Sequence, residues 1–320
     1  MRHFLDFEKP LYALEAKIEE LRNLDEESHG VNLAEDILKL KEKAHAFLEE
    51  TYRQLTPWQK VLVARHPQRP HLSDYIDALF SDFVALKGDR YFAEDPAILC
   101  GVARFHDKPV CVMGHRKGKD TQTRLHHNFG MAHPEGYRKA VRIMHLADRF
   151  HLPIISFIDT PGAYPGVEAE MRGQAEAIAQ AINACLHVKT PFISIITGEG
   201  GSGGAIALAT ANAIFMLEHA VYSVITPEAC SSILWRNKDH SQTAAQAMKM
   251  TAQDLKQLGL IDDIIPEPLG GAHRNYPETI AMIEQTLERS MRQLSSLDRE
   301  TLHRQKRDKF LAQTRQFVTP

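Results

Sequence analysis

The sequence is poor in cysteine, in net charge and in long apolar runs, and each shortage excludes a class of protein. Its four cysteines, Cys100, Cys111, Cys185 and Cys230, form no C-x-x-C pair, so we expect reduced, mostly buried thiols and neither a disulfide framework nor a zinc ribbon. No stretch approaches the roughly 18 apolar residues of a membrane helix, and the amino terminus lacks the apolar segment of a signal peptide. We therefore expect a cytoplasmic protein with no membrane segment.

A formal net charge of -3 gives no global attraction to nucleic acid, so dedicated nucleic-acid binding is not expected. The 17 histidines match no metal-ligand spacing such as H-E-x-x-H, and we predict no metal site. With 43% hydrophobic and 25% charged residues, the composition is that of a compact globular protein. A chain of 320 residues can form one large α/β domain with helical additions or two small domains.

Residues 1–60 have the apolar periodicity of two amphipathic helices joined by a turn at residues 25–30. The two apolar stripes consist of Leu11, Leu14, Ile18 and Leu21, and of Leu33, Ile37, Leu40, Ala44 and Phe47. Such a hairpin has to bury its stripe, and the sequence leaves open whether the protein's own core or a partner subunit covers it.

The middle of the chain has the pattern of an α/β fold. Residues 97–105 and 110–113 predict a β-hairpin, and two strand, glycine loop and helix units follow, with strands at 153–158 and 191–196. This alternation predicts a largely parallel sheet with its ligand site at the glycine loops. Residues 277–294 again predict a helix, and a basic, solvated helix or tail is expected from 296 to 320.

The glycine loop at residues 198–204 reads G-E-G-G-S-G-G and leads directly into a helix of small residues. Backbone N–H groups at such a helix start favour negative charge, so the loop predicts either a phosphate cradle or an oxyanion hole. A phosphate-binding P-loop needs a lysine followed by serine or threonine, whereas this helix starts Gly204-Ala205, which disfavours an ATP site. Close helix packing alone would explain about one glycine, not five in seven residues.

The same loop matches G-x-S-x-G, the nucleophile elbow of α/β-hydrolases, with Ser202 as the nucleophile. His219, His240 and His273 lie downstream, but none is paired with an obvious acid in the sequence. Glycine on both sides of Ser202 also suits catalysis by backbone donors alone.

Six segments together carry a resemblance that covers nearly the whole chain. They are residues 128–131, 134–139, 157–166, 198–204, 231–235 and 260–275. On these segments the sequence resembles the family of alpha subunits of bacterial acetyl-coenzyme A carboxylase carboxyltransferases. The resemblance implies an α/β, crotonase-like (ClpP/crotonase) β-β-α superhelix with an N-terminal helical hairpin and C-terminal helices. We expect an interaction hairpin at 1–60, a crotonase-like carboxyltransferase domain of the C-terminal type at 61–295 and a basic tail at 296–320.

The resemblance also implies partners and a reaction. The alpha subunit would act with a beta subunit, as an α2β2 heterotetramer, and the beta subunit would carry the zinc and most of the coenzyme A site. Together they would transfer the carboxyl group from carboxybiotin on the biotin carboxyl carrier protein to acetyl-CoA, giving malonyl-CoA for fatty-acid synthesis. ATP would be used only by the biotin carboxylase.

Carboxybiotin leaves an anionic ureido oxygen and acetyl-CoA becomes an enolate, so the reaction needs two oxyanion sites. We assign the backbone N–H groups of Gly203, Gly204 and Ala205 to the biotin oxygen. The other residues expected to line the substrate site are Gly162, Ala163, Glu199, Gly201 and Ser202. The biotin anion can itself accept the acetyl proton, so Glu199 and Glu168 are expected to position rather than to catalyse.

The basic segment 114–119 departs from the family pattern. Arg116 and Lys119 stand where other residues are usual, and His126-His127 replaces a basic pair. Arg116, Lys117 and Lys119 are candidates for contact with a substrate phosphate or with the partner subunit, and a solvated loop is the alternative.

Two other functions stay open at this point. A stand-alone crotonase-fold acyl-CoA hydratase or hydrolase would use Glu199 with Glu168, or Ser202, and a non-catalytic scaffold would need none of these residues. Because substitution at Ser202 and Gly204 affects these functions differently, they can be told apart by experiment.

Overall fold

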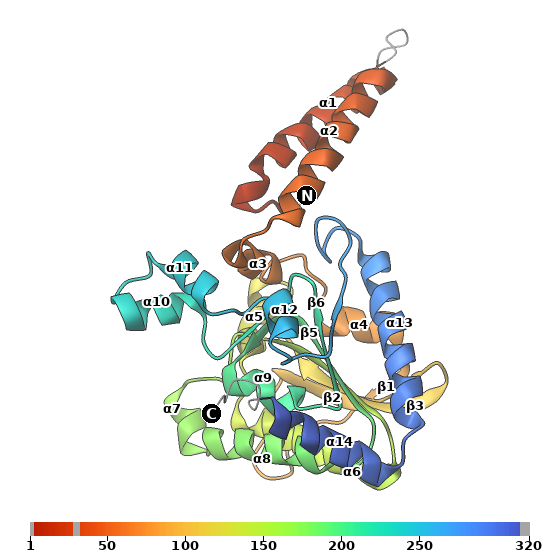
Figure 1. The fold of residues 1–320 in the computed structure, drawn as a ribbon, viewed down its shortest axis with the longest axis vertical. Coiled ribbons are helices and arrows are strands. Elements are labelled where there is room, and N and C mark those ends of the chain that lie inside the picture. Colours follow the sequence, from red (N-terminus) through yellow and green to blue (C-terminus); the bar gives the residue numbers. More distant parts are fainter. Residues whose placement is uncertain (1–2, 28–32, 314–320) are drawn as a thin grey trace.

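The fold is built around one mixed sheet, which the computed structural model describes together with its helices over residues 3–27 and 33–313 (Figure 1). In this part of the chain the sheet has eight strands, in the order β1-β2-β3-β4-β5-β6-β8, with β7 paired to β5 off this path. The strands are β1 Ser81–Ala85, β2 Ile98–Phe105, β3 Lys108–His115, β4 Ile154–Thr160, β5 Phe192–Gly201, β6 Ala213–Leu217, β7 Val221–Ser223 and β8 Asp263–Ile265.

The pairing of the strands changes direction once along the sheet. β1, β2 and β3 are antiparallel, and β3 to β6, β7 and β8 are joined by parallel pairing. The β-hairpin and both buried strands expected from the sequence are therefore confirmed as β2-β3, β4 and β5. Because the parallel strands are buried on both faces, they read as continuous apolar runs rather than as alternating patterns.

Helices cover both faces of this sheet. The helices are α1 Lys9–Glu27, α2 Ala34–Arg53, α3 Pro57–Ala64, α4 Leu72–Leu79, α5 Thr121–His126, α6 Pro134–Phe150, α7 Val167–Met171, α8 Gln174–His187, α9 Ser202–Ala209, α10 Pro227–Trp235, α11 Ser241–Ala247, α12 Ala252–Gln257, α13 Tyr276–Ser295 and α14 Arg299–Ala312. On β4, the Ser156 hydroxyl donates to the Leu208 carbonyl of α9 at 2.8 Å, whereas Phe157 stacks on Tyr75 of α4 at 5.2 Å. Since neighbouring side chains of a strand point to opposite faces, α9 and α4 lie on opposite sides of the sheet. α8 packs beside α9, α6 packs beside α8, and α13 packs beside α4.

Near its carboxyl end, β5 changes its pairing partner. The first half of β5 pairs with β6 at Ile193 to Ile196, and its last residues, Glu199 to Gly201, pair with β7 instead. β5 thus extends beyond β6 through the glycine-rich segment, and α9 begins immediately after it at Ser202. This places the start of α9 at the same sheet edge as the ends of β3 and β4.

The N-terminal hairpin projects from the sheet domain (Figure 1). α1 and α2 pack against each other and bury Leu11, Ile18, Ile37 and Ala44 in a cluster separate from the main core. The stripe is therefore buried largely within the hairpin itself. The predicted turn at residues 25–30 lies partly outside the described residues.

The C-terminal helix α14 differs from the solvated helix that we expected. Its residues Leu302 and Lys306 are buried, and Lys306 donates to the Val188 carbonyl at the end of α8 at 2.8 Å. We expected a solvated helix because the segment is rich in charged residues. Two buried side chains that lie one helical turn apart are nevertheless enough to dock one face of α14 on the core. No described helix combines the length and the hydrophobicity that crossing a bilayer requires. Cys100, Cys111 and Cys185 are buried free thiols, as expected, and Cys230 is half-buried.

Candidate active site

Two glycine loops meet at the carboxyl edge of the sheet. A Cβ atom at Gly201 would lie 2.1 Å from the Pro161 carbonyl oxygen, and a Cβ at Gly204 would lie 2.8 Å from the Ala163 nitrogen. Any side chain at these two positions would collide with backbone atoms. Because both residues are glycines, the start of α9 can lie directly against residues 161–163. The structure thereby brings together residues that the sequence places 40 positions apart.

The start of α9 offers backbone N–H groups to this junction. The first N–H groups of a helix have no partner within the helix, and the helix dipole adds positive potential there. Gly203 is half-exposed at this end, while Gly204 and Ala205 are buried. Gly162 lies opposite with a φ of 153°, and a Cβ built there would meet no atom within 4 Å, so the junction opens beside Gly162.

Ser202 carries the sharp change of direction between β5 and α9. Its φ of 53° lies in the left-handed region, which is rare for a residue other than glycine. Such backbone conformations persist only where the surrounding structure enforces them. Among the described residues, the hydrogen bonds of histidine rings go to partners other than the Ser202 hydroxyl, so the structure gives no support to a nucleophile and base pair at the elbow.

Below the glycine turn, which we define as residues 200–204, charged side chains join the ends of three neighbouring strands. Lys117, which follows β3, places its Nζ 2.8 Å from Asp159 Oδ1 on β4 and 2.8 Å from Glu199 Oε2 on β5. The same Asp159 oxygen accepts the backbone N–H of Glu199 at 2.9 Å. Two of the three ammonium hydrogens of Lys117 are therefore directed to carboxylates of the protein.

Arg65, at the C-terminal end of α3, approaches Glu199 from the other side. Its Nε donates to Glu199 Oε1 at 2.6 Å, and its two terminal nitrogens contact both carboxylate oxygens of Glu228 on α10. We call Lys117, Asp159, Glu199, Arg65 and Glu228 the ion-pair network. It connects the strand ends to a helix outside the sheet.

The network keeps its carboxylates ionised. Burial by itself would raise the pKa of Glu199, but the Lys117 ammonium and the Arg65 guanidinium outweigh it, and the pKa lies below its ordinary value. The pKa of Asp159 is lowered in the same way, chiefly by Lys117, and the pKa of Lys117 is raised by the two carboxylates despite its burial. Glu199 is thus poorly suited to carry a proton, which disfavours the acid-base role that a hydratase would require.

Glu168, the other acid of that alternative, lies apart from the network. It is exposed on α7, where its pKa is lowered by hydrogen bonds to its own backbone N–H and to the Tyr164 hydroxyl. Its carboxylate lies 4.0 Å from His133, whereas Glu199 contacts Lys117 and Arg65. The two acids therefore share no partner among these contacts.

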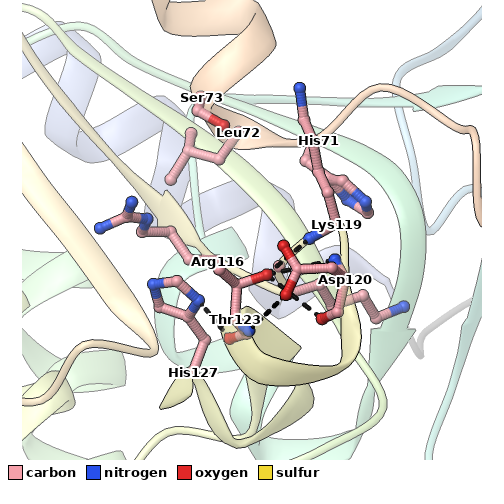
Figure 2. A pocket seen from close by; sticks show the side chains of 10 residues that line it. His71, Leu72, Ser73, Arg116, Lys119, Asp120, Thr123 and His127 are labelled. Carbon is pink, nitrogen blue, oxygen red and sulfur yellow. Dashed lines mark hydrogen bonds between the residues drawn. The ribbon is translucent and has the colours of Figure 1, made fainter. Parts of the chain in front are cut away.

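A basic cavity of about 190 Å³ lies beside the network (Figure 2). Its walls include Arg116, Lys117, Lys119, His71 and His127. Burial and the nearby positive charge of Arg116 both lower the pKa of His127, whose Nδ1 lies 2.6 Å from the Thr123 carbonyl oxygen. Lys119 is an exposed residue paired with Asp74.

A second cavity of about 230 Å³ adjoins the first, since His71 and Lys117 line both. It reaches Pro161 and Glu199, and therefore the glycine junction, and Arg124 and Phe129 form part of its wall. The basic segment predicted as a ligand contact is thus continuous with the junction. Arg116 faces the cavity, whereas Lys117 mainly holds the network.

Lys117 and Glu199 were predicted as site residues from the sequence, whereas Asp159, Arg65 and Glu228 were not. Asp159 had a usable signal, because charged residues at the ends of buried parallel strands meet at one edge of the sheet. Arg65 and Glu228 had none, since they lie 134 residues before and 29 residues after Glu199 on helices whose packing the sequence does not specify. No group of three or more metal-ligating side chains suited to an ion is found within residues 3–27 and 33–313.

Comparison with known proteins identifies a family over nearly the whole chain. Residues 4–314 match the family model described as acetyl co-enzyme A carboxylase carboxyltransferase-like. The acetyl-coenzyme A carboxylase carboxyl transferase subunit alpha of Methylobacterium sp. (strain 4-46) is 58% identical over 311 residues, covering 97% of this chain and 98% of its own. The protein of the same name from Paramagnetospirillum magneticum is 56% identical over 309 residues, covering 97% of each chain.

Solved structures support the fold at much lower identity. Transcarboxylase 12S with methylmalonyl-coenzyme A bound has a TM-score of 0.58 at 16% identity, covering 71% of this chain and 42% of its own. A chain of a Pseudomonas malonate decarboxylase hetero-tetramer in complex with coenzyme A has a TM-score of 0.60 at 15% identity, covering 77% and 97%. These likenesses confirm the crotonase-like α/β fold predicted from the sequence.

Proposed function

We infer the function from one premise, that the chain belongs to the family of acetyl-CoA carboxylase carboxyltransferase alpha subunits. It is the alpha subunit of a biotin-dependent carboxyltransferase, which with a beta subunit transfers the carboxyl group of carboxybiotin to acetyl-CoA to form malonyl-CoA. The observation that carries this function is the glycine junction, where the start of α9 lies open beside Gly162 and offers amide donors to an oxyanion.

The amide groups of Gly203, Gly204 and Ala205 bind the biotin-side oxyanion in this proposal. Loss of the carboxyl group leaves negative charge on the ureido oxygen of biotin, and fixed backbone dipoles stabilise such charge without reorganising. Two features support the assignment: these residues form the first turn of α9, and the space beside Gly162 is unfilled. Ala163 and Gly201 shape the opposite wall, and Ser202 sets the direction of the turn.

Arg116 is the cation of the basic segment that we propose for substrate contact. A guanidinium beside His127 in a cavity continuous with the junction suits an anionic group of the acyl-CoA or of carboxybiotin. Lys119 lies at the exposed rim of the same cavity and would add to the attraction. Lys117 has one ammonium hydrogen left for a ligand and lines both cavities.

The partners and cofactors follow from the same function. The beta subunit would complete the active site in an α2β2 assembly and would hold the zinc and most of the coenzyme A site. Carboxybiotin would arrive on the biotin carboxyl carrier protein as a substrate, and ATP would be consumed by the biotin carboxylase. We place the assembly in the cytoplasm, where it would supply malonyl-CoA for fatty-acid synthesis.

The test is the reverse half-reaction, malonyl-CoA-dependent carboxylation of free biotin. It is measured with this chain alone, with a matching beta subunit alone, and with the two mixed. We expect activity only in the mixture. Activity of this chain alone would contradict the shared site, as would the absence of activity in an intact complex, and hydration or hydrolysis of an acyl-CoA by this chain alone would favour the stand-alone alternative.

A further inference from the structure

The glycine turn has few means of holding its own shape. Four of its five residues at 200–204 are glycines, which lose more conformational freedom on folding than other residues, and Ser202 occupies a left-handed conformation. Backbone donors in an oxyanion hole have to be held to within about 0.5 Å of the productive geometry. The pairing of Gly200 and Gly201 with β7 supplies part of the rigidity, and neighbouring side chains have to supply the rest.

Glu199, the residue directly before the turn, is held at three points. Its N–H donates to Asp159, one carboxylate oxygen contacts Lys117, and the other contacts Arg65 at 2.6 Å. Its side chain is only 10% exposed, so water competes weakly for these contacts. With backbone and side chain both fixed, Glu199 sets where the turn begins.

Lys117 and Asp159 belong to the sheet edge itself, but Arg65 does not. It reaches Glu199 from α3, and its guanidinium continues to Glu228 on α10, with side chains 28% and 29% exposed. The guanidinium holds both carboxylates at once through separate nitrogens, and its bond to Glu199 is the one that adjoins the turn. In these bonds Arg65 contacts Glu199 and no glycine of the turn, and its side chain also lines the second cavity.

We propose that Arg65 is a positioning residue for carboxyl transfer, acting through Glu199 to hold the glycine turn in the geometry that backbone donation requires; this rests on the proposed function. Removing the guanidinium leaves the Glu199 carboxylate with Lys117 as its ion-pair partner and lets that carboxylate and the adjacent turn shift. Since a displacement of about 1 Å at a catalytic site can cost about 100-fold in rate, the effect should appear in kcat.

The kinetic test compares Arg65→Gln, Arg65→Lys and Glu228→Gln in the complete complex with the beta subunit. We expect Arg65→Gln to lower kcat of the reverse half-reaction about 10- to 100-fold with KM values within about twofold, and Arg65→Lys to recover most of the loss. Glu228→Gln should cost less than about threefold, because Arg65 keeps its bond to Glu199. Arg292→Gln, which removes an exposed ion pair with Glu288, is the matched control and should change neither constant.

Three kinetic results would overturn the proposal. A rise in KM with unchanged kcat for Arg65→Gln would make Arg65 a substrate contact, and an equal loss of kcat in Glu228→Gln would mean that Arg65 acts through α10 rather than through the turn. Full activity of Arg65→Gln would also reject it.

Amide hydrogen exchange of this chain without the beta subunit tests the proposal independently of activity. Peptides covering residues 198–205 should exchange at least about fivefold faster in Arg65→Gln than in the wild type, and Arg65→Lys should restore protection. Unchanged exchange would reject the positioning role. A wild-type complex without activity but with this exchange pattern would instead reject the proposed function and keep the structural coupling.

Discussion

At the scale of single residues, Gly204 is a position of the glycine junction that has no room for a side chain. A Cβ atom there would lie 2.8 Å from backbone atoms of Gly162 and Ala163 and 3.0 Å from the Tyr137 hydroxyl. Gly204→Ala should therefore separate the two loops, lowering the free energy of unfolding by about 2 kcal/mol and carboxyl transfer by about 100-fold. Urea denaturation and the reverse half-reaction measure the two effects.

Gly203→Ala is the comparison for that variant. Its Cβ would meet only Ile178, at 3.3 Å from a methyl group that can move, and its backbone N–H is retained. We expect a change in unfolding free energy within about 1 kcal/mol and a loss of rate below about tenfold. Equal losses for the two variants would show that the contact between the loops does not determine activity.

The hydroxyl and the backbone of Ser202 make separate contributions. If the amides carry the chemistry, Ser202→Ala should keep carboxyl transfer within about threefold, because only the hydroxyl is lost. Ser202→Gly should raise the unfolding free energy by about 0.5 kcal/mol, since glycine accepts the positive φ without strain but loses more entropy on folding. Abolished activity in Ser202→Ala would restore the nucleophile hypothesis.

At the scale of the elements, α14 shows how a charged helix can dock on the core. Leu302 and Lys306 are 2% and 1% exposed, and Lys306 has the Val188 carbonyl as its hydrogen-bond partner. Burial lowers the pKa of Lys306 to about 8, from an ordinary value near 10.5. The folded state therefore binds fewer protons than the unfolded state between these two values, so stability rises with pH through this window.

The lowered pKa of Lys306 predicts that Lys306→Met stabilises the protein at neutral pH. At pH 7 the wild type buries a charged ammonium, and the substitution should raise the free energy of unfolding by about 2 kcal/mol after the loss of one hydrogen bond. The gain should shrink as the pH rises through 8 towards 10.5, where the wild-type lysine is neutral. Urea denaturation at pH 7 and pH 10 measures the difference, and a destabilised variant at pH 7 would show that the bond to Val188 outweighs the buried charge.

At the scale of the whole molecule, the sequence predicted the units of the fold better than the connections between them. The β2-β3 hairpin, β4, β5 and the glycine loops followed from local apolar periodicity and glycine spacing. The contacts of Arg65 with Glu199 and Glu228 join three elements far apart in the sequence, and no local pattern encodes them. The hairpin was likewise predicted as two helices, but its self-contained core depends on how α1 and α2 pair.

Arg274 of the body makes ion pairs with the hairpin at the joint between the two. Arg274 contacts Glu8 at 3.3 Å and Glu15 at 2.9 Å, and Glu8 is fully buried, with the Tyr52 hydroxyl as a further partner. Arg274→Met would leave the Glu8 carboxylate buried without its cation, at a cost of about 3 kcal/mol. Because the hairpin keeps a core of its own, this cost should loosen the joint rather than unfold the helices.

Limited trypsin digestion measures that loosening at Arg53, the last residue of α2. We expect cleavage there at least about tenfold faster in Arg274→Met than in the wild type, while the sheet domain stays protected. Glu15→Gln is the matched control, since it leaves the Glu8–Arg274 pair in place, and its cleavage should stay close to the wild-type rate. Unchanged cleavage at Arg53, or cleavage spread equally over the sheet domain, would show that the hairpin and the body open as one unit rather than at this joint.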